Sequence, residues 1–375
     1  MKMSINSTNK TNIGLILMNG HFDERFYMVI GSNWTFDSIY LFLISPWSFL
    51  NFLLNIISFY ILHQIKENSK SARLYTYLKV YIADCALMCF LGSFIFCTYS
   101  PRYFSFALGI IGRIFRCEIF NSVTTLLYFY SNILDIFITF ERLSQLSLNS
   151  KSYINKISPF KLCVIGFIGC LIFNSPSFFW NYIQSDEEFY GGARDLANLE
   201  KFSYCGRTDF IKSNLGSILS LLMIIIRDFI TLIFEIIFDI LSILYYRQFL
   251  RKKNQIGIGQ ISSIVLNREK TKANNKTNNI NNNNNIKGIN QIMNRVSMSD
   301  MNLFSMTITL SVISSTSHLM TASTTFFLIF FKTNYQSTYL IFLVSAIVNT
   351  IKYFSNFFIL YFFNKKFQYL FKKII

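Results

Sequence analysis

The chain is poor in the residues that enzymes and metal sites most often use. It has three histidines, and His21, His63 and His318 lie far apart in the sequence. Glycine-rich phosphate loops are also missing, and charged residues make up only 14% of the 375 positions. We therefore expect no metal cluster, no Cys/His dyad and no cofactor. The sequence predicts that the protein is not an enzyme.

Proline is scarce as well, and its distribution is uneven. The four prolines are Pro46, Pro101, Pro159 and Pro176, so the second half of the chain has none. Proline is the most common cause of a sharp kink in a helix. Helices expected in the second half therefore lack this cause of a kink.

Apolar and aromatic residues are abundant: 52% of the chain is hydrophobic, including 42 Phe, and 21 Tyr are present. They gather in seven blocks, each long enough for a membrane crossing, which takes about 20 apolar residues. The blocks lie near 38–62, 74–98, 117–141, 161–182, 215–246, 304–331 and 338–363. The sequence predicts an all-α membrane protein that forms a seven-transmembrane helix bundle over 38–363.

The net charge of +16 is explained by membrane topology rather than by nucleic acid. Most Lys and Arg residues fall in the first, third and fifth loops and in the tail, and cytoplasmic loops collect these residues. We therefore expect a multi-pass protein of the plasma membrane with its N-terminus outside. The extracellular segment 1–37 carries glycosylation sequons at Asn6, Asn9 and Asn33, which agrees with this orientation.

Two segments differ from the apolar blocks. Residues 254–300 are polar, rich in Asn and low in complexity, so we expect a disordered cytoplasmic loop. Residues 364–375 place apolar side chains at helical spacing, with lysines on the other side. This pattern predicts a short amphipathic C-terminal helix on the anionic inner membrane surface, with membrane lipid as its partner. A frayed basic tail is the alternative.

Cysteine and arginine mark the two ends of the third block. Cys117 begins it and Arg142 follows 25 residues later, a helix length of about 37 Å that puts the two on opposite sides of the membrane. Cys205 lies in the next outer loop. Thiols on the outer side are oxidised in secreted and surface proteins, so we expect a Cys117–Cys205 disulfide. Cys97, near an outer helix end, remains an alternative partner.

Several polar residues recur at spacings known from one receptor family. The first block has Asn55, the second has Asp84 in "LKVYIADCALM", and the seventh has Asn356 before "NKKF". Together with the cysteine pair and the Glu141-Arg142 pair, they resemble the rhodopsin-like G-protein-coupled receptors. The "RD" of the fifth block and "NFF…Y…NKKF" are similar to invertebrate FMRFamide-type neuropeptide receptors.

The resemblance implies a function for the end of the third block. Glu141 would hold Arg142 in an ionic lock when the receptor is inactive, and Arg142 would meet a heterotrimeric G protein when it is active. We expect Asp239 of the fifth block to reach Arg142 as well. The motif departs from the family at Leu143, where a Tyr is usual. The alternative is that Glu141 and Arg142 only mark the membrane boundary.

The resemblance also implies a transmembrane polar core made by Asn55, Asp84, Ser131, Lys352 and Asn356. In the family, the residues that Asp84, Ser131 and Asn356 match surround a sodium ion. Here Lys352 stands where a second Asn is expected, so we hypothesise an Asp84–Lys352 ion pair in place of the ion. Asp135 is a competing partner, and Lys352 extending alone to the membrane surface is the alternative.

The ligand expected from the resemblance is an extracellular peptide. Thr124, Arg227 and His318 are the candidate contacts, although His318 also fits a packed polar residue. The missing prolines of the fifth, sixth and seventh blocks depart from the family, so a divergent receptor without G-protein coupling is one alternative. A seven-helix transporter or channel is the other.

Overall fold

The computed structural model describes residues 43–65, 72–94, 110–146, 157–179, 181–183, 205–248, 251, 279–330 and 335–374. The candidate sequons Asn6, Asn9 and Asn33 lie outside these residues, as does Cys97. The elements before the fifth block are α4 (Ser45–Gln64), α5 (Ala72–Ser93), α8 (Ile110–Ile114), the π-helix η2 (Phe115–Val123), α9 (Thr124–Leu146), α10 (Pro159–Asn174), the 3₁₀ helix η4 (Ser175–Phe179), and strands β1 (Asn181–Ile183) and β2 (Cys205–Arg207). Those that follow are α12 (Asp209–Lys212), α13 (Asn214–Ile224), the π-helix η6 (Ile225–Ile230), an α-helical run over 231–248, α15 (Asn279–Phe330), α16 (Tyr335–Phe363) and α17 (Lys365–Ile374).

Six helical stretches are long and apolar enough to cross a membrane within the described part of the chain. They are Ser45–Gln64, Ala72–Ser93, Glu118–Ser144, Pro159–Phe179, Asn302–Phe327 and Leu343–Phe363. These helices indicate a multi-pass membrane protein. The fifth expected span, 215–246, is helical, but η6 interrupts its α-helix and it carries several charged residues. The seven-helix count is therefore still a prediction.

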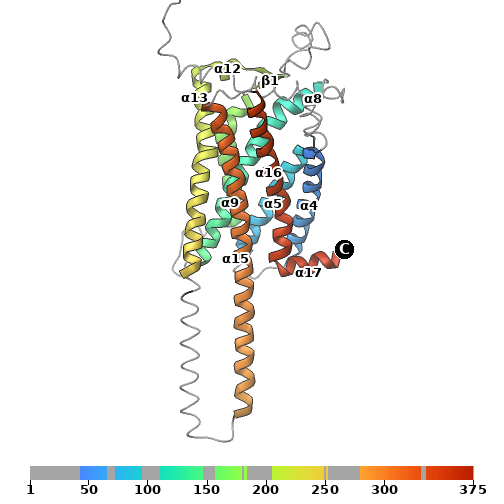
Figure 1. Cartoon of the computed structure of the whole chain (residues 1–375), viewed down its shortest axis with the longest axis vertical. Coiled ribbons are helices and arrows are strands. Elements are labelled where there is room, and N and C mark those ends of the chain that lie inside the picture. Colours follow the sequence, from blue (N-terminus) through green and yellow to red (C-terminus); the bar gives the residue numbers. More distant parts are fainter. Residues whose placement is uncertain are drawn as a thin grey trace, which may run out of the picture.

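The helices form an upright bundle in which α9 is tilted and lies among its neighbours (Figure 1). Helix α9 contacts α5, α10 and α15, while α4 contacts α5 and α16. Helix α15 contacts α16 and η6, which brings the segment 214–248 against the bundle. The long elements α5, α10, α16 and the segment 214–248 therefore pack around α9 and α15.

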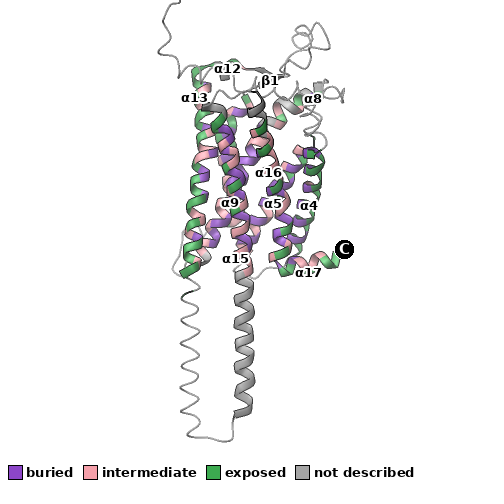
Figure 2. Ribbon diagram, viewed as in Figure 1, coloured by how far each residue is buried: buried purple, intermediate pink, exposed green. Residues whose placement is uncertain are grey.

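Buried residues lie between the helices of the bundle and exposed residues lie on its outside (Figure 2); the buried set includes many polar residues and the exposed set many large apolar ones. In α4, Ser48, Asn51, Asn55 and Ser58 are buried, while large apolar side chains of the same helix are exposed. Small and polar residues between helices, with apolar residues outside, are typical of helices that pack in lipid. The pattern agrees with the membrane assignment.

A two-stranded antiparallel hairpin lies at the end of the bundle opposite α17 (Figure 1). In this hairpin, Ile183 of β1 is the register partner of Cys205 of β2. Strand β1 also contacts η2, the element that contains Cys117. The backbone therefore brings the cysteine-bearing elements to the same end of the molecule, while both cysteine side chains lie outside the described part.

The structure differs from the expectation of disorder over part of 254–300. Residues 279–300 are helical and extend α15 beyond the bundle, while 254–278 lie outside the described residues (Figure 1). Adding residues to an existing helix avoids the cost of nucleating a new one. This explains how an Asn-rich sequence can continue a membrane helix.

Helix α17 packs across the end of the bundle, at a steep angle to α16 (Figure 1). Asn364 begins it: its Oδ1 accepts hydrogen bonds from the backbone N–H groups of Lys366 and Phe367, both at 3.1 Å. The Asn364 Nδ2 group donates to the Tyr75 hydroxyl of α5 at 2.8 Å. Phe367 is fully buried against Phe357 of α16, while the four lysines of α17 are exposed. The helix is thus amphipathic and fixed to the bundle.

Candidate functional site

Polar side chains form a continuous stripe on each of four elements that face one another in the bundle. We name this set the polar core. Its members are Tyr128, Asn132, Asp135 and Thr139 of α9, Asp228, Thr231, Glu235 and Asp239 of the segment 214–248, Ser311, Ser314, His318 and Thr325 of α15, and Asn349, Lys352 and Asn356 of α16. Residues three or four positions apart share one helix face, which produces the stripes. Charges at membrane depth are costly and usually functional.

An ion pair joins α16 to α9 at the centre of the polar core. The Lys352 ammonium lies 3.4 Å from Asp135 Oδ2, and both side chains are buried. The Ser314 hydroxyl of α15 donates to the same carboxylate oxygen. One carboxylate therefore ties together three helices, and the hydrogen bond from Ser314 helps to offset the cost of burying the charge.

The partner of Lys352 is thus Asp135, the competing candidate of the sequence analysis, and not Asp84. Asp84 is buried on α5, and neither of its carboxylate oxygens has a hydrogen-bond partner among the described residues. The hypothesis of an Asp84–Lys352 pair is wrong in this structure because the ammonium is drawn to Asp135 on the central helix. A carboxylate that already accepts from Ser314 is the better solvated anion for the ammonium to join.

Asp84 and Lys352 aside, the residues that the receptor resemblance placed in a transmembrane polar core are all buried. The amide of Asn55 donates to the Tyr353 carbonyl oxygen at 3.2 Å, which connects α4 to α16. Ser131 and Asn356 are buried as well. Asn55 therefore acts as a link between helix backbones.

A second cluster of the polar core is centred on the imidazole of His318. Its Nδ1 lies 3.1 Å from Glu235 Oε2, and both side chains are buried. Its Nε2 lies 3.3 Å from Asn132 Nδ2, 3.3 Å from Thr231 Oγ1 and 3.2 Å from the Arg227 carbonyl oxygen. His318 therefore connects α15 with α9 and with the segment 214–248.

Two of the three candidate ligand contacts adjoin this cluster. The Arg227 guanidinium pairs with the neighbouring Asp228 at 2.6 and 2.7 Å, and Thr325 donates to Asp228 at 3.3 Å. His318 is fully buried. The third candidate, Thr124, lies at the start of α9, where its hydroxyl donates to the Phe120 carbonyl oxygen of the preceding turn. The structure thus brings two of the three together and leaves Thr124 outside the polar core.

The ion pair observed for Glu141 is with a residue of another helix. Arg73, at the start of α5, donates from Nε to Glu141 Oε2 at 3.1 Å and from Nη1 to the Ile157 carbonyl oxygen at 2.8 Å. Glu141 and Arg142 are both buried. Arg73 therefore holds the end of α9 against α5 and the chain entering α10, a role that sequence analysis did not assign.

Asp239 differs from the expectation of a contact with Arg142. Its carboxylate accepts hydrogen bonds from Ser311 and from Ser315 of α15, the latter at 3.2 Å. Serine hydroxyls one turn apart on α15 provide short-range donors for this half-buried acid. The contact of Asp239 is thus between the segment 214–248 and α15.

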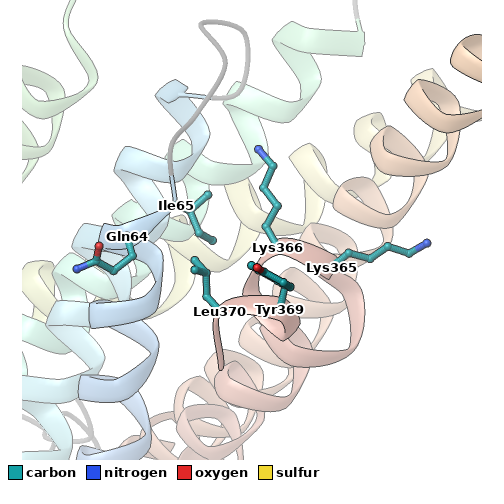
Figure 3. A pocket seen from close by; sticks show the side chains of 6 residues that line it. All are labelled: Gln64, Ile65, Lys365, Lys366, Tyr369 and Leu370. Carbon is teal, nitrogen blue, oxygen red and sulfur yellow. The ribbon is translucent and has the colours of Figure 1, made fainter. Parts of the chain in front are cut away.

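Among the described residues, no group of His, Cys, Asp and Glu has the arrangement needed to hold a metal ion. An open pocket lies between the end of α4 and α17 (Figure 3). It is lined by Gln64, Ile65, Lys365, Lys366, Tyr369 and Leu370. Its apolar floor and lysine rim suit a membrane surface rather than a catalytic reaction.

No family profile matches this chain, and no curated protein matches its sequence. The receptor family expected from the motifs is therefore not shown by overall sequence similarity. A function is therefore argued from the buried charges of the polar core and from the ends of α9 and α17.

Proposed function

We propose that this chain is a receptor of seven membrane-crossing helices that transmits the binding of an extracellular ligand to a heterotrimeric G protein. The seventh crossing is the segment 214–248, which contacts α15 through η6. Its charged residues Asp228, Glu235 and Asp239 all have partners in the polar core. Polar residues that are satisfied inside a bundle are compatible with a membrane crossing even where the sequence is less apolar.

The single observation that carries the proposal is the position of Glu141 and Arg142 near the end of α9. This central helix ends with Glu141 and Arg142 buried against α5, at the same end of the bundle as α17. Tyr75, two residues after Arg73, contacts Asn364 at the start of α17. A basic amphipathic helix lies on the cytoplasmic membrane surface. Arg142 is then at the cytoplasmic end, in reach of a G protein.

The ligand enters from the other end, where η2 and the β1–β2 hairpin lie. We propose that Cys117 and Cys205 form a disulfide there, that Asn6, Asn9 and Asn33 carry glycans, and that the ligand is a neuropeptide. Ligand binding changes the bundle only through its different affinity for two conformations. The polar core connects the two ends because α9, α15 and α16 meet at Asp135.

The proposal is tested by nucleotide exchange on purified G proteins. The full chain in lipid nanodiscs should accelerate exchange on at least one heterotrimer, and Arg142→Ala should abolish the acceleration. Lys161→Ala, which removes an exposed cation at the start of α10, is the matched control and should leave the rate unchanged. Equal rates for the parent chain and the Arg142 variant across a panel of G proteins would overturn the proposal.

Buried ion pairs also occur in transport pathways, so a transporter or channel is the second candidate. Liposomes containing the parent chain separate the two functions. Flux of ions or solutes without nucleotide exchange would favour transport. Absence of both would favour a receptor that has lost G-protein coupling.

A further inference from the structure

We propose that His318, Glu235 and Asn132 form an exchangeable proton-binding site, whose occupancy changes how α15 is hydrogen-bonded to its neighbours. The proposal does not depend on the receptor function. It rests on the hydrogen-bonding roles of the groups around one buried imidazole. His318 is fully buried, and both of its ring nitrogens have partners.

The Nδ1 atom of His318 carries a proton in either state. Its partner at 3.1 Å is Glu235 Oε2, which we take as ionised in the proposal, and an ionised carboxylate only accepts hydrogen bonds. The Nδ1–H group therefore donates to Glu235. This bond fixes the tautomer of the neutral imidazole and leaves Nε2 as the atom that gains or loses the exchangeable proton.

The surroundings of Nε2 fit both protonation states. In the neutral state, its lone pair accepts from Asn132 Nδ2 at 3.3 Å. In the charged state, Nε2–H donates to the Arg227 carbonyl oxygen at 3.2 Å or to Thr231 Oγ1 at 3.3 Å. Thr231 is able to accept because its own hydrogen is donated to the same carbonyl.

The amide of Asn132 is able to follow the proton. Its Oδ1 has no hydrogen-bond partner in the observed orientation, so that orientation satisfies only the neutral imidazole. A half-turn of the amide exchanges Nδ2 and Oδ1 and gives Nε2–H a further acceptor. Proton uptake therefore reverses the bond to α9 and gives α15 bonds to the segment 214–248 that the neutral imidazole lacks.

Charges on every neighbouring element act on this site. Glu235 is the closest, and the Arg227–Asp228 pair lies on the same segment. From α9, the Tyr128 ring packs edge-on against the imidazole, and Asp135 lies within electrostatic range of Glu235. From α16, Lys352 pairs with Asp135 and lies within range of Glu235 too. His318 is the only ionisable residue of α15 between Asn302 and Phe330. Glu235 is thus the anion available to favour the bound proton.

The test is nitrogen-15 NMR of the histidine side chains in the full chain, embedded in nanodiscs, from pH 5 to pH 9. The chain has three histidines, and His318→Gln identifies the His318 signals by their loss. The signals of His318 should pass from an imidazolium pattern to that of the neutral Nδ1–H tautomer within this range. A His318 signal that keeps one form at every pH overturns the proposal.

Two variants test the partners. Glu235→Gln should reduce the imidazolium fraction of His318 at pH 7 at least several-fold, because the anion that favours it is removed. Glu118→Gln, which neutralises an acid of η2 outside the polar core, is the control and should leave that fraction unchanged. Asn132→Leu should change the Nε2 chemical shift of the neutral imidazole, because it removes the group that donates to the Nε2 lone pair. An unchanged imidazolium fraction in the Glu235 variant, or an unchanged Nε2 shift in the Asn132 variant, overturns the assignment.

Discussion

Removing one partner of the Lys352–Asp135 ion pair should destabilise the bundle strongly. Two unit charges 3.4 Å apart attract by about 5 kcal/mol at an effective dielectric constant of about 20. A variant that removes one charge leaves the other buried without its counter-ion. The cost of breaking a buried pair in this way is about 3–5 kcal/mol. Asp135→Asn and Lys352→Met should each lower the free energy of unfolding by this amount.

Removing both charges together should cost less than either single change. Because no unpaired charge remains in the double variant, its stability should lie between that of the parent chain and those of the single variants. The four buried cysteines Cys85, Cys89, Cys163 and Cys170 provide the assay. A thiol-reactive dye reports their exposure as the detergent-solubilised protein is heated.

The double-mutant cycle with Asp84 is the matched control. Asp84→Asn and Lys352→Met should couple more weakly than the Asp135 and Lys352 changes, because the ion pair of Lys352 is with Asp135 on α9. The reasoning is refuted if the Asp135 and Lys352 changes simply add. A strong coupling between Asp84 and Lys352 would refute it too, and would favour the pairing expected from the sequence.

Three further predictions concern the end of the bundle where α17 lies. Phe367→Ala should lower the free energy of unfolding by about 3–5 kcal/mol because this ring is 0% exposed, whereas Phe362→Ala, at 67% exposed, should cost far less; thermal unfolding with the same dye compares them. Arg73→Gln should loosen the end of α9 by removing the ion pair that joins Glu141 to α5, so basal nucleotide exchange should rise; an unchanged or lowered rate speaks against a restraining role for this ion pair. Changing the four lysines of α17 to Gln should remove the extra thermal stability that phosphatidylserine nanodiscs confer over phosphatidylcholine nanodiscs, and equal gains for both chains would exclude lipid binding through these lysines.

The helices were predictable from the sequence because lipid imposes long apolar runs that few other environments require. The segment 215–246 is the instructive exception: its charged residues lower its apolar signal and the π-helix η6 interrupts its α-helix, although the segment is helical. Disorder over 279–300 was expected from the Asn content, yet the structure continues α15 there. The amino-acid composition of a segment does not show that the segment adjoins a helix that is already formed.

The polar core was only partly predictable. Lys352 and Asp84 stand out as charges within apolar blocks, but sequence alone does not say which acid faces the ammonium, because that depends on how α5, α9 and α16 rotate against one another. Asn132, Asp135 and Thr139 have helical spacing, which indicates a polar face on α9. The sequence analysis relied on the motifs at the two ends of this helix and did not identify that face. The pairing of Arg73 with Glu141 joins residues 68 positions apart, which no local pattern indicates.

The number of membrane crossings tests the central claim most directly. Six helices in the described part of the chain are apolar enough to cross, and the receptor function requires the segment 214–248 to be the seventh. Epitope tags at the two ends of the full chain, stained in intact and in permeabilised cells, count the crossings as odd or even. The account predicts that the N-terminal tag stains intact cells and that the C-terminal tag stains only after permeabilisation. Staining of both tags from the same side of the membrane would contradict it.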